Sequence, residues 1–340
     1  MNICRTNIKT QKWMFQTLVL VALMFLLVKT LYHFSSVILF PYDITNGEGF
    51  VLRDAYNSYK SIPIYRTADK YPFLVSTYPP LFAWLAGKIM LLTGPSFIAT
   101  RLLSSLACFG LALAIAIYLK ILKTSWYIAI TASLFFLGSI YIFYWGAWSR
   151  VDTLAAFFSL ASVVLVGYRQ SVITILLASL CCIFAFYSKQ SALASWFAIS
   201  IYLFLKHKKL FLYFNGCFFV LLISSFLIIN FETQGEFFKH MITYNKLRWY
   251  PRVFAGQLKN FVATHVLFIM AYIYFVKNSN WKYNSETLVL IYASVAFATT
   301  VTTGREGAST NYFIESIAIL SVSLGLVQRH WDIDESLSIP

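Results

Sequence analysis

The sequence predicts an all-α protein that crosses a membrane about ten times, and three observations lead to this prediction. Of the 340 residues, 59% are hydrophobic and only 12% are charged, whereas a soluble domain is nearer a quarter charged. Apolar runs recur along the whole chain with few charges inside them. The short connections after alternate runs are basic, which is typical of the cytoplasmic side of a membrane protein.

The first apolar run, 13–40, follows Arg5, Lys9 and Lys12. It is too long for the apolar region of a signal peptide, so we expect an uncleaved first span with a cytoplasmic N-terminus. Lys29 interrupts the run and should snorkel to the interface or face the protein interior. The other predicted spans are 97–119, 126–146, 153–168, 172–187, 190–205, 210–230, 261–276, 286–303 and 311–327.

Two long segments, 41–96 and 231–260, fall on the outer side if the N-terminus is inside. Segment 81–93 is apolar but short, with Lys88 in its middle, and we expect it to lie along the interface as a helix. No internal repeat or domain boundary is visible, so we expect one transmembrane domain over 1–340 with both termini cytoplasmic. The short connections that this topology places inside are basic, around Lys120, Arg169, 206–209 and Arg329.

Composition also narrows the class of partner. The net charge is +14, but topology explains part of it and no nucleic-acid motif is present, so membrane lipids are expected partners and nucleic acid is not. The five Cys residues show neither disulfide nor metal-ligand spacing. The sequence therefore contains no metal motif, and a divalent cation as cofactor is left open.

Most of the 13 Asp and Glu residues fall on the predicted outer side. Acids at a membrane boundary are costly and are candidates for function. Glu48 lies between two glycines, which should leave its carboxylate sterically open to act as a general base. Asp43, in the same loop, is the rival candidate. The structural alternative is a solvated turn, because Asn46-Gly47 is a turn signal.

A second acid, Asp152, follows Arg150 just before an apolar helix. It fits an N-cap or first-turn acid or a partner of Arg150, and it also fits a second catalytic carboxylate that orients an acceptor or a metal. Lys189 lies alone in a very short outer connection. A phosphate ligand is one role for it, and snorkelling is the alternative.

The last outer loop, 303–315, is rich in Gly and small polar residues. Arg305 and the amides of the following helix start could hold an anionic group; the alternative is a weak surface pair with Glu306. Glu315 should lie about one turn inside the membrane, where it must be paired or face an aqueous cavity.

Taken together, these residues resemble the GT-C superfamily of membrane glycosyltransferases, in particular the protein O-mannosyltransferase and aminoarabinose-transferase-like group. The resemblance extends over nearly the whole chain and depends on the order and side of its motifs. These are an acid at Asp43 or Glu48, Ile64-Tyr65, Tyr78-Pro79-Pro80-Leu81-Phe82, Gly94, Arg101, Arg150-Val151-Asp152-Thr153-Leu154-Ala155, Ser188-Lys189-Gln190, Gly307 and Asn311-Tyr312-Phe313-Ile314-Glu315.

The resemblance implies transfer of a sugar, with inversion, from a polyprenyl-phosphate donor to a glycan, lipid or protein acceptor. It implies an active site on the periplasmic or exterior face of a bacterial inner membrane. Glu48 or Asp43 would be the general base, with Glu48 favoured, and Asp152 would be a supporting acid. The implied substrate-binding residues are Tyr78, Arg150, Lys189, Arg305, Asn311 and Glu315.

Two other classes share this composition. A polymerase or ligase of lipid-linked oligosaccharides would have the same topology and basic outer loops. A transporter or flippase would be expected to show broken helices and inverted repeats, and neither is clear in the sequence. Formation of a glycosidic bond separates the enzyme classes from transport.

Overall fold

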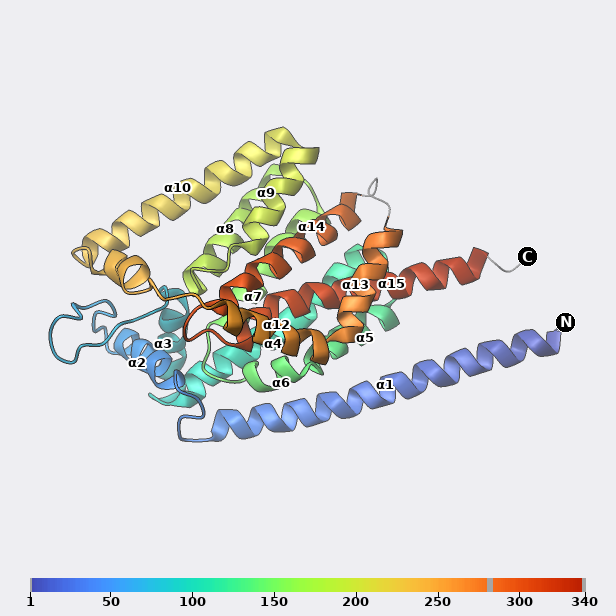
Figure 1. Cartoon of the computed structure of the whole chain (residues 1–340), viewed down its shortest axis with the longest axis horizontal. Coiled ribbons are helices and arrows are strands. Elements are labelled where there is room, and N and C mark those ends of the chain that lie inside the picture. The colour runs from blue at the N-terminus through green and yellow to red at the C-terminus, as the bar shows by residue number, and fades with distance from the viewer. Residues whose placement is uncertain (1, 280–283, 338–340) are drawn as a thin grey trace.

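The computed structural model describes residues 2–279 and 284–337, which form helices joined by loops (Figure 1). Within these ranges there is no β-sheet, and the one isolated bridge pairs Trp249 with Arg305. The all-α prediction is therefore confirmed. The helices are α1 Asn2–Leu39, α2 Glu48–Tyr59, α3 Leu81–Thr93, α4 Phe97–Ile121, α5 Trp126–Leu137, α6 Ile140–Trp145, α7 Asp152–Tyr168, α8 Val172–Ser188, α9 Ala194–Lys206, α10 Lys208–Glu232, α11 Glu236–Phe238, α12 Pro251–Thr264, α13 Val266–Asn278, α14 Asn284–Thr299 and α15 Ile314–Leu337, with short π or 3₁₀ turns at Lys239–Thr243, Thr300–Gly304 and Thr310–Phe313.

Five stretches of the described chain are long and apolar enough to cross a membrane, and the bent pair of α12 and α13 would make a sixth. Five further helices, α3, α5, α7, α8 and α9, are apolar but shorter. An integral membrane protein with several spans is thus the class that the helices fit. The number of about ten crossings remains a prediction.

Two predicted spans are interrupted. The run 126–146 is divided into α5 and α6 at Gly138 and Ser139. The run 261–276 contains the break between α12 and α13, which meet at an angle of 86°, and its crossing of the membrane stays a prediction. The break falls at His265, whose buried ring is hydrogen-bonded to Ser139 Oγ at 2.8 Å. The His265 side chain thus holds the bend between α12 and α13 against Ser139.

Helix α15 lies at the centre of the bundle, whereas α1 and α10 lie along opposite margins (Figure 1). In the most apolar stretch of α15, 78% of residues are buried, against 11% in α1 and in α10. Small residues allow the inner helices to approach closely. A Cβ added at Gly167 of α7 would lie 2.5 Å from the Tyr118 ring of α4, so that crossing requires glycine.

Both termini lie at one end of the bundle, and α2, α3 and the loop 60–80 lie at the other (Figure 1). Helix α3 begins directly after Pro80, a residue suited to the start of a helix. It packs against α2 and α4. The predicted helix over 81–93 is therefore present, while its position along a membrane interface stays a prediction.

Arg101 of α4 joins the first loop to the bundle. Its side chain is completely buried, and it donates from Nε and Nη2 to the two carboxylate oxygens of Glu48, at 3.0 and 2.8 Å. The remaining N–H groups bond the backbone oxygens of Val37, Phe40 and Tyr42 at the end of α1. One guanidinium thus fixes both the end of α1 and the start of α2.

Glu48 is equally buried and accepts two further hydrogen bonds. The backbone N–H of Ser149 donates to Oε1 at 2.7 Å, and that of Ile44 donates to Oε2 at 2.8 Å. Both carboxylate oxygens are therefore bonded twice, and the charge of each partner is neutralised by the other. Removing one member of such a pair leaves an uncompensated buried charge, which costs roughly 3–5 kcal/mol.

We expect Glu48→Gln and Arg101→Met each to lower the thermal stability of the detergent-solubilised protein by a large and similar amount. The double variant should lose less than the sum of the two, because neither charge is then left alone. A thermal unfolding double-mutant cycle measures this coupling. Additive losses would mean that the pair does not interact energetically.

The same pair makes stability depend on pH. Burial alone would raise the pKa of Glu48, but hydrogen bonds from Arg101, Ser149 and Ile44 and the Arg101 charge outweigh it, and the pKa lies below its ordinary value. A lowered pKa contributes stability above the unfolded value of about 4.3, and this stability is lost as pH falls through the folded value.

We therefore expect the unfolding temperature of the wild type to fall more steeply below about pH 4.3 than that of Glu48→Gln. Unfolding curves recorded between neutral and acidic pH make the comparison. Parallel curves would show that other acids determine the acid sensitivity.

Candidate functional site

Two adjoining cavities bring together six of the residues that the sequence singled out. The loop cavity, of about 200 Å³, is walled by four loop segments, at 77–78, 189–191, 245–247 and 305–312. The inner pocket, of about 30 Å³, lies between the start of α7, the α8–α9 connection, the end of α14 with the 3₁₀ turn after it, and the start of α15. Lys189, Ser191 and Tyr312 line both. The six residues are Tyr78, Asp152, Lys189, Arg305, Asn311 and Glu315.

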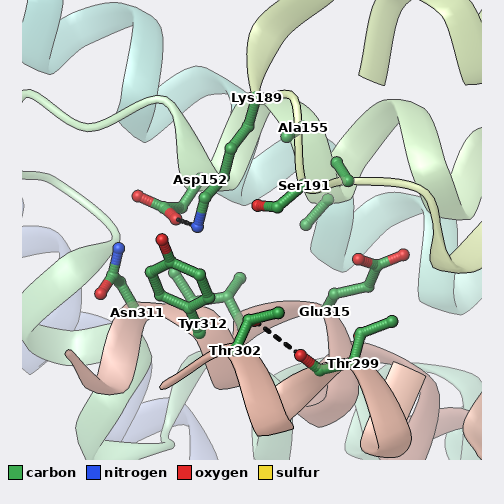
Figure 2. Close-up of a pocket in the computed structure, with 12 residues that line it drawn as sticks. Asp152, Ala155, Lys189, Ser191, Thr299, Thr302, Asn311, Tyr312 and Glu315 are labelled. Carbon is green, nitrogen blue, oxygen red and sulfur yellow. Dashed lines mark hydrogen bonds and ion pairs between the residues drawn. The ribbon is translucent and has the colours of Figure 1, made fainter. Parts of the chain in front are cut away.

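The centre of the site is an ion pair between Asp152 and Lys189 (Figure 2). Asp152 is the first residue of α7, where a carboxylate is favoured by the helix dipole, and Lys189 follows the last residue of α8. Lys189 Nζ lies 2.5 Å from Asp152 Oδ1, and the two residues are 6% and 5% exposed. Of the roles that the sequence leaves open for Asp152, the first-turn acid is observed, and its ion-pair partner is Lys189 in place of Arg150.

Lys189 keeps its charge in this setting. Burial alone would lower the pKa of Lys189, but the Asp152 carboxylate more than compensates, so that the pKa lies above its ordinary value. The ammonium group also lies 3.3 Å from the centre of the Tyr312 ring, a cation–π contact. The group is a permanent positive charge at the boundary of the two cavities.

The second oxygen of Asp152, Oδ2, makes no hydrogen bond of ordinary geometry in the described part of the chain. The Asn311 amide is turned toward the carboxylate (Figure 2), and both residues line the inner pocket. Buried polar atoms are seldom left unbonded, and such an atom calls for an explanation. Asp152 Oδ2 is a hydrogen-bond acceptor available to a molecule in the site.

Arg305 reaches the loop cavity from a paired loop. The backbone of 304–306 bonds that of 248–250, with Tyr250 N–H donating to Gly304 O at 2.8 Å and Glu306 N–H donating to Arg248 O at 2.9 Å. The Arg305 guanidinium donates to Asn245 O. Arg305 therefore supplies a fixed positive charge near Lys189, on the side of the cavity formed by loops.

Hydrogen bonds between loops surround the loop cavity, and the sequence did not predict these bonds. Gln190 Nε2 and Asn245 Nδ2 both donate to Thr77 O, at 2.9 and 3.3 Å. Next to Thr77, Ser76 N–H donates to Nδ1 of the buried His240 at 2.9 Å. We call these contacts the roof. No local pattern marks these residues, because their partners lie far away in the sequence.

Tyr78 also lines the loop cavity. Its backbone oxygen accepts a hydrogen bond from Tyr65 Oη at 2.8 Å, which fixes the chain at this point. Burial and the nearby Asp152 carboxylate raise the pKa of Tyr78. The phenol therefore stays protonated and can donate a hydrogen bond to a bound molecule.

Arg150 lies beside the two cavities and lines neither. Its guanidinium packs against Gly47, where an added Cβ would lie 2.6 Å from Nη1, and it is 5.4 Å from the centre of the Trp145 ring. Nη2 donates to Thr45 Oγ1 at 3.4 Å. Arg150 thus connects the first loop to α7, and its charge contributes to the site from outside.

The two acids of the first loop also line neither cavity. The expectation that glycines leave Glu48 open is wrong, because its carboxylate is 0% exposed and paired with Arg101. Asp43 is exposed, and its Oδ1 accepts the Thr45 N–H at 3.1 Å. Of the three candidate acids, Asp152 is the one that faces a cavity.

An apolar groove of about 420 Å³ runs between α3, α8 and α10. Trp84, Ile183, Leu221 and Ile228 are among its lining residues. The groove and the loop cavity are lined by neighbouring stretches of chain: Tyr187 lines the groove and Lys189 the cavity, and Pro80 lines the groove and Tyr78 the cavity. Among the described residues, no group of three or more His, Cys, Asp or Glu is placed to hold a metal ion.

Comparison with known proteins gives no match to any protein-family model and none to curated proteins by sequence. Solved structures do match. ArnT from Cupriavidus metallidurans in the apo state aligns with a TM-score of 0.66 at 12% identity, over 91% of this chain and 61% of that one. The same protein bound to undecaprenyl phosphate gives 0.65 at 13% identity, with the same coverage.

The archaeal oligosaccharyltransferase AglB from Archaeoglobus fulgidus, in complex with an inhibitory peptide and a dolichol-phosphate, aligns with a TM-score of 0.55 at 10% identity, over 93% of this chain and 51% of that one. The chain thus spans about three fifths of the length of ArnT and half that of AglB. This chain therefore shares its fold with ArnT and with an archaeal oligosaccharyltransferase. The resemblance to the GT-C superfamily is confirmed at the level of the fold.

Proposed function

We propose that the protein is a membrane glycosyltransferase that moves a sugar from a polyprenyl-phosphate donor to an acceptor hydroxyl or amine. The observation that supports this most directly is the position of the Asp152–Lys189 pair, between a cavity that Arg305 and Glu306 also line and a polar pocket. The fold shared with ArnT and AglB supports the same class, because structures of both contain a polyprenyl-type phosphate.

The lipid tail, the phosphate and the sugar of the donor would lie in the apolar groove, the loop cavity and the inner pocket, respectively. The apolar groove between α3, α8 and α10 suits the polyprenyl tail, since it is lined almost wholly by hydrocarbon. The phosphate would lie in the loop cavity against Lys189 and Arg305, which supply a point charge and a planar donor group. The sugar would then extend toward Asp152 and the inner pocket.

In the proposed reaction Asp152 Oδ2 accepts the proton of the acceptor as the acceptor oxygen or nitrogen attacks the anomeric carbon. The bond between that carbon and the phosphate oxygen breaks, and its electron pair stays on the lipid phosphate. Lys189 and Arg305 stabilise the charge that develops there. A single displacement inverts the anomeric configuration and requires one base, unlike the carboxylate pairs of glycosidases.

The proposal is tested by incubating the purified protein with radiolabelled polyprenyl-phosphate sugars and an acceptor panel. Appearance of a glycosidic bond is the expected result. Movement of the donor across proteoliposomes without bond formation would instead assign the protein to transport. Transfer of a whole oligosaccharide in preference to a single sugar would assign it to the polymerase or ligase class.

We expect Asp152→Asn to lower kcat by about 10²–10⁴-fold, the usual contribution of a general base, with a smaller effect on the donor KM. Asp43→Asn is the matched control, because Asp43 is exposed and lies outside both cavities. Its activity should stay near that of the wild type. Loss of activity in Asp43→Asn and not in Asp152→Asn would move the base to the first loop.

Lys189→Met should weaken donor binding, because a charge-assisted hydrogen bond is worth about 1.5–3 kcal/mol. This corresponds to a rise of about 10- to 150-fold in the donor KM. Lys246→Met is the control, since Lys246 lies exposed on a neighbouring loop. Because Lys189→Met leaves the Asp152 carboxylate unpaired, the folding of this variant is compared with that of the double variant Lys189→Met/Asp152→Asn. An unchanged donor KM would remove Lys189 from phosphate binding.

A further inference from the structure

The inner pocket is smaller and more polar than a donor site requires. It is a cavity of about 30 Å³ behind Lys189 and Tyr312. A single water needs about 10–15 Å³ of such space, so the pocket holds two, or at most three, groups of the size of a hydroxyl. Its polar lining is Asp152, Lys189, Ser191, Thr299, Thr302, Asn311, Tyr312 and Glu315.

These groups offer both hydrogen-bond donors and acceptors. Glu315 projects from the first turn of α15, and its Oε1 accepts the Tyr292 hydroxyl at 2.7 Å, which holds the carboxyl in place. Thr302 Oγ1 donates to Thr299 O at 2.6 Å (Figure 2), so its remaining capacity is to accept. Asp152 Oδ2 has no hydrogen bond of ordinary geometry, and the Lys189 ammonium is a donor.

We propose that the inner pocket selects the sugar, by accepting one hydroxyl or hydroxymethyl substituent of a neutral hexose. The inference rests on the proposed glycosyltransferase function and specifies its donor class. A hydroxyl both donates and accepts, which matches the mixed lining. Asp152 Oδ2, which has no hydrogen bond of ordinary geometry, gains a partner when such a group enters, and its second lone pair stays available for the proton of the acceptor.

The pocket also excludes two common kinds of sugar. An N-acetyl group has three heavy atoms beyond its nitrogen, and at about 10–15 Å³ each these would fill or overfill the pocket. A uronic acid would bring a carboxylate beside Asp152 and Glu315, with Lys189 as the one cation of the lining. Like charges in a site of this kind oppose binding. Hexoses are therefore preferred over N-acetylhexosamines and hexuronates.

The test compares polyprenyl-phosphate glucose, N-acetylglucosamine and glucuronate as donors for the purified protein. In the wild type, kcat/KM for glucose should exceed that for each of the others by about 100-fold or more, as expected of a buried polar site. Similar kcat/KM for all three would overturn the inference and leave the proposed function in place. Transfer from none of them, nor from any other donor, would overturn both.

Two variants test the pocket itself. Ile314→Ala removes a buried lining side chain, and it should raise the ratio of N-acetylglucosamine to glucose transfer at least tenfold. Ile317→Ala is the matched control, because Ile317 is equally buried one turn away and does not line the pocket. An equal change in both variants would assign the effect to general loosening and reject the pocket.

Glu315→Gln keeps the size of the side chain and removes its charge. It should raise the ratio of glucuronate to glucose transfer about tenfold or more while leaving exclusion of N-acetylglucosamine unchanged. Unfolding temperatures recorded for each variant separate selectivity from loss of fold. A Glu315→Gln variant that accepted both excluded donors equally would contradict a role for charge.

Discussion

Charges buried in this bundle must be paired, and the arrangement of the end that carries the two cavities depends on two such pairs. Glu48 with Arg101 and Asp152 with Lys189 each join segments far apart in the sequence. In the first pair both carboxylate oxygens are bonded twice. In the second pair one carboxylate oxygen is unbonded beside two cavities. The fully bonded Glu48–Arg101 pair stabilises the fold, whereas the free oxygen of Asp152 beside the cavities can bond another molecule.

Much of this could be predicted from the sequence, because membranes restrict what a chain can do. Apolar runs in lipid must be helical, which gave the all-α class and the place of most helices. Acids at the ends of such runs are costly, so Asp152 and Glu315 stood out. Lys189 stood out as a lone lysine in a short connection, Arg305 as a cation in a Gly-rich loop, and Tyr78 through the family resemblance. The structure places all five at one pair of cavities. These residues could be predicted because a polar side chain beside an apolar run is visible in the sequence without knowledge of its partner.

Other features depended on partners that no local pattern displays. Glu48 was read as open from its flanking glycines, yet its partner Arg101 lies 53 positions later. The break at His265 follows from a bond to Ser139, 126 positions earlier. His240 likewise bonds Ser76 across 164 positions. Glycine indicates what the backbone can do, and it does not indicate which side chain will fill the space beside it.

The roof over the loop cavity consists of hydrogen bonds between loops, with Thr77 O shared by Gln190 and Asn245. Each such bond is worth only about 0.5–1.5 kcal/mol net, so these contacts can break while the helices stay packed. In the proposed reaction, a bulky acceptor would enter through this local opening. Turnover on large acceptors would then follow the microsecond-to-millisecond motion of the loops, and would be more sensitive to solvent viscosity than turnover on small ones.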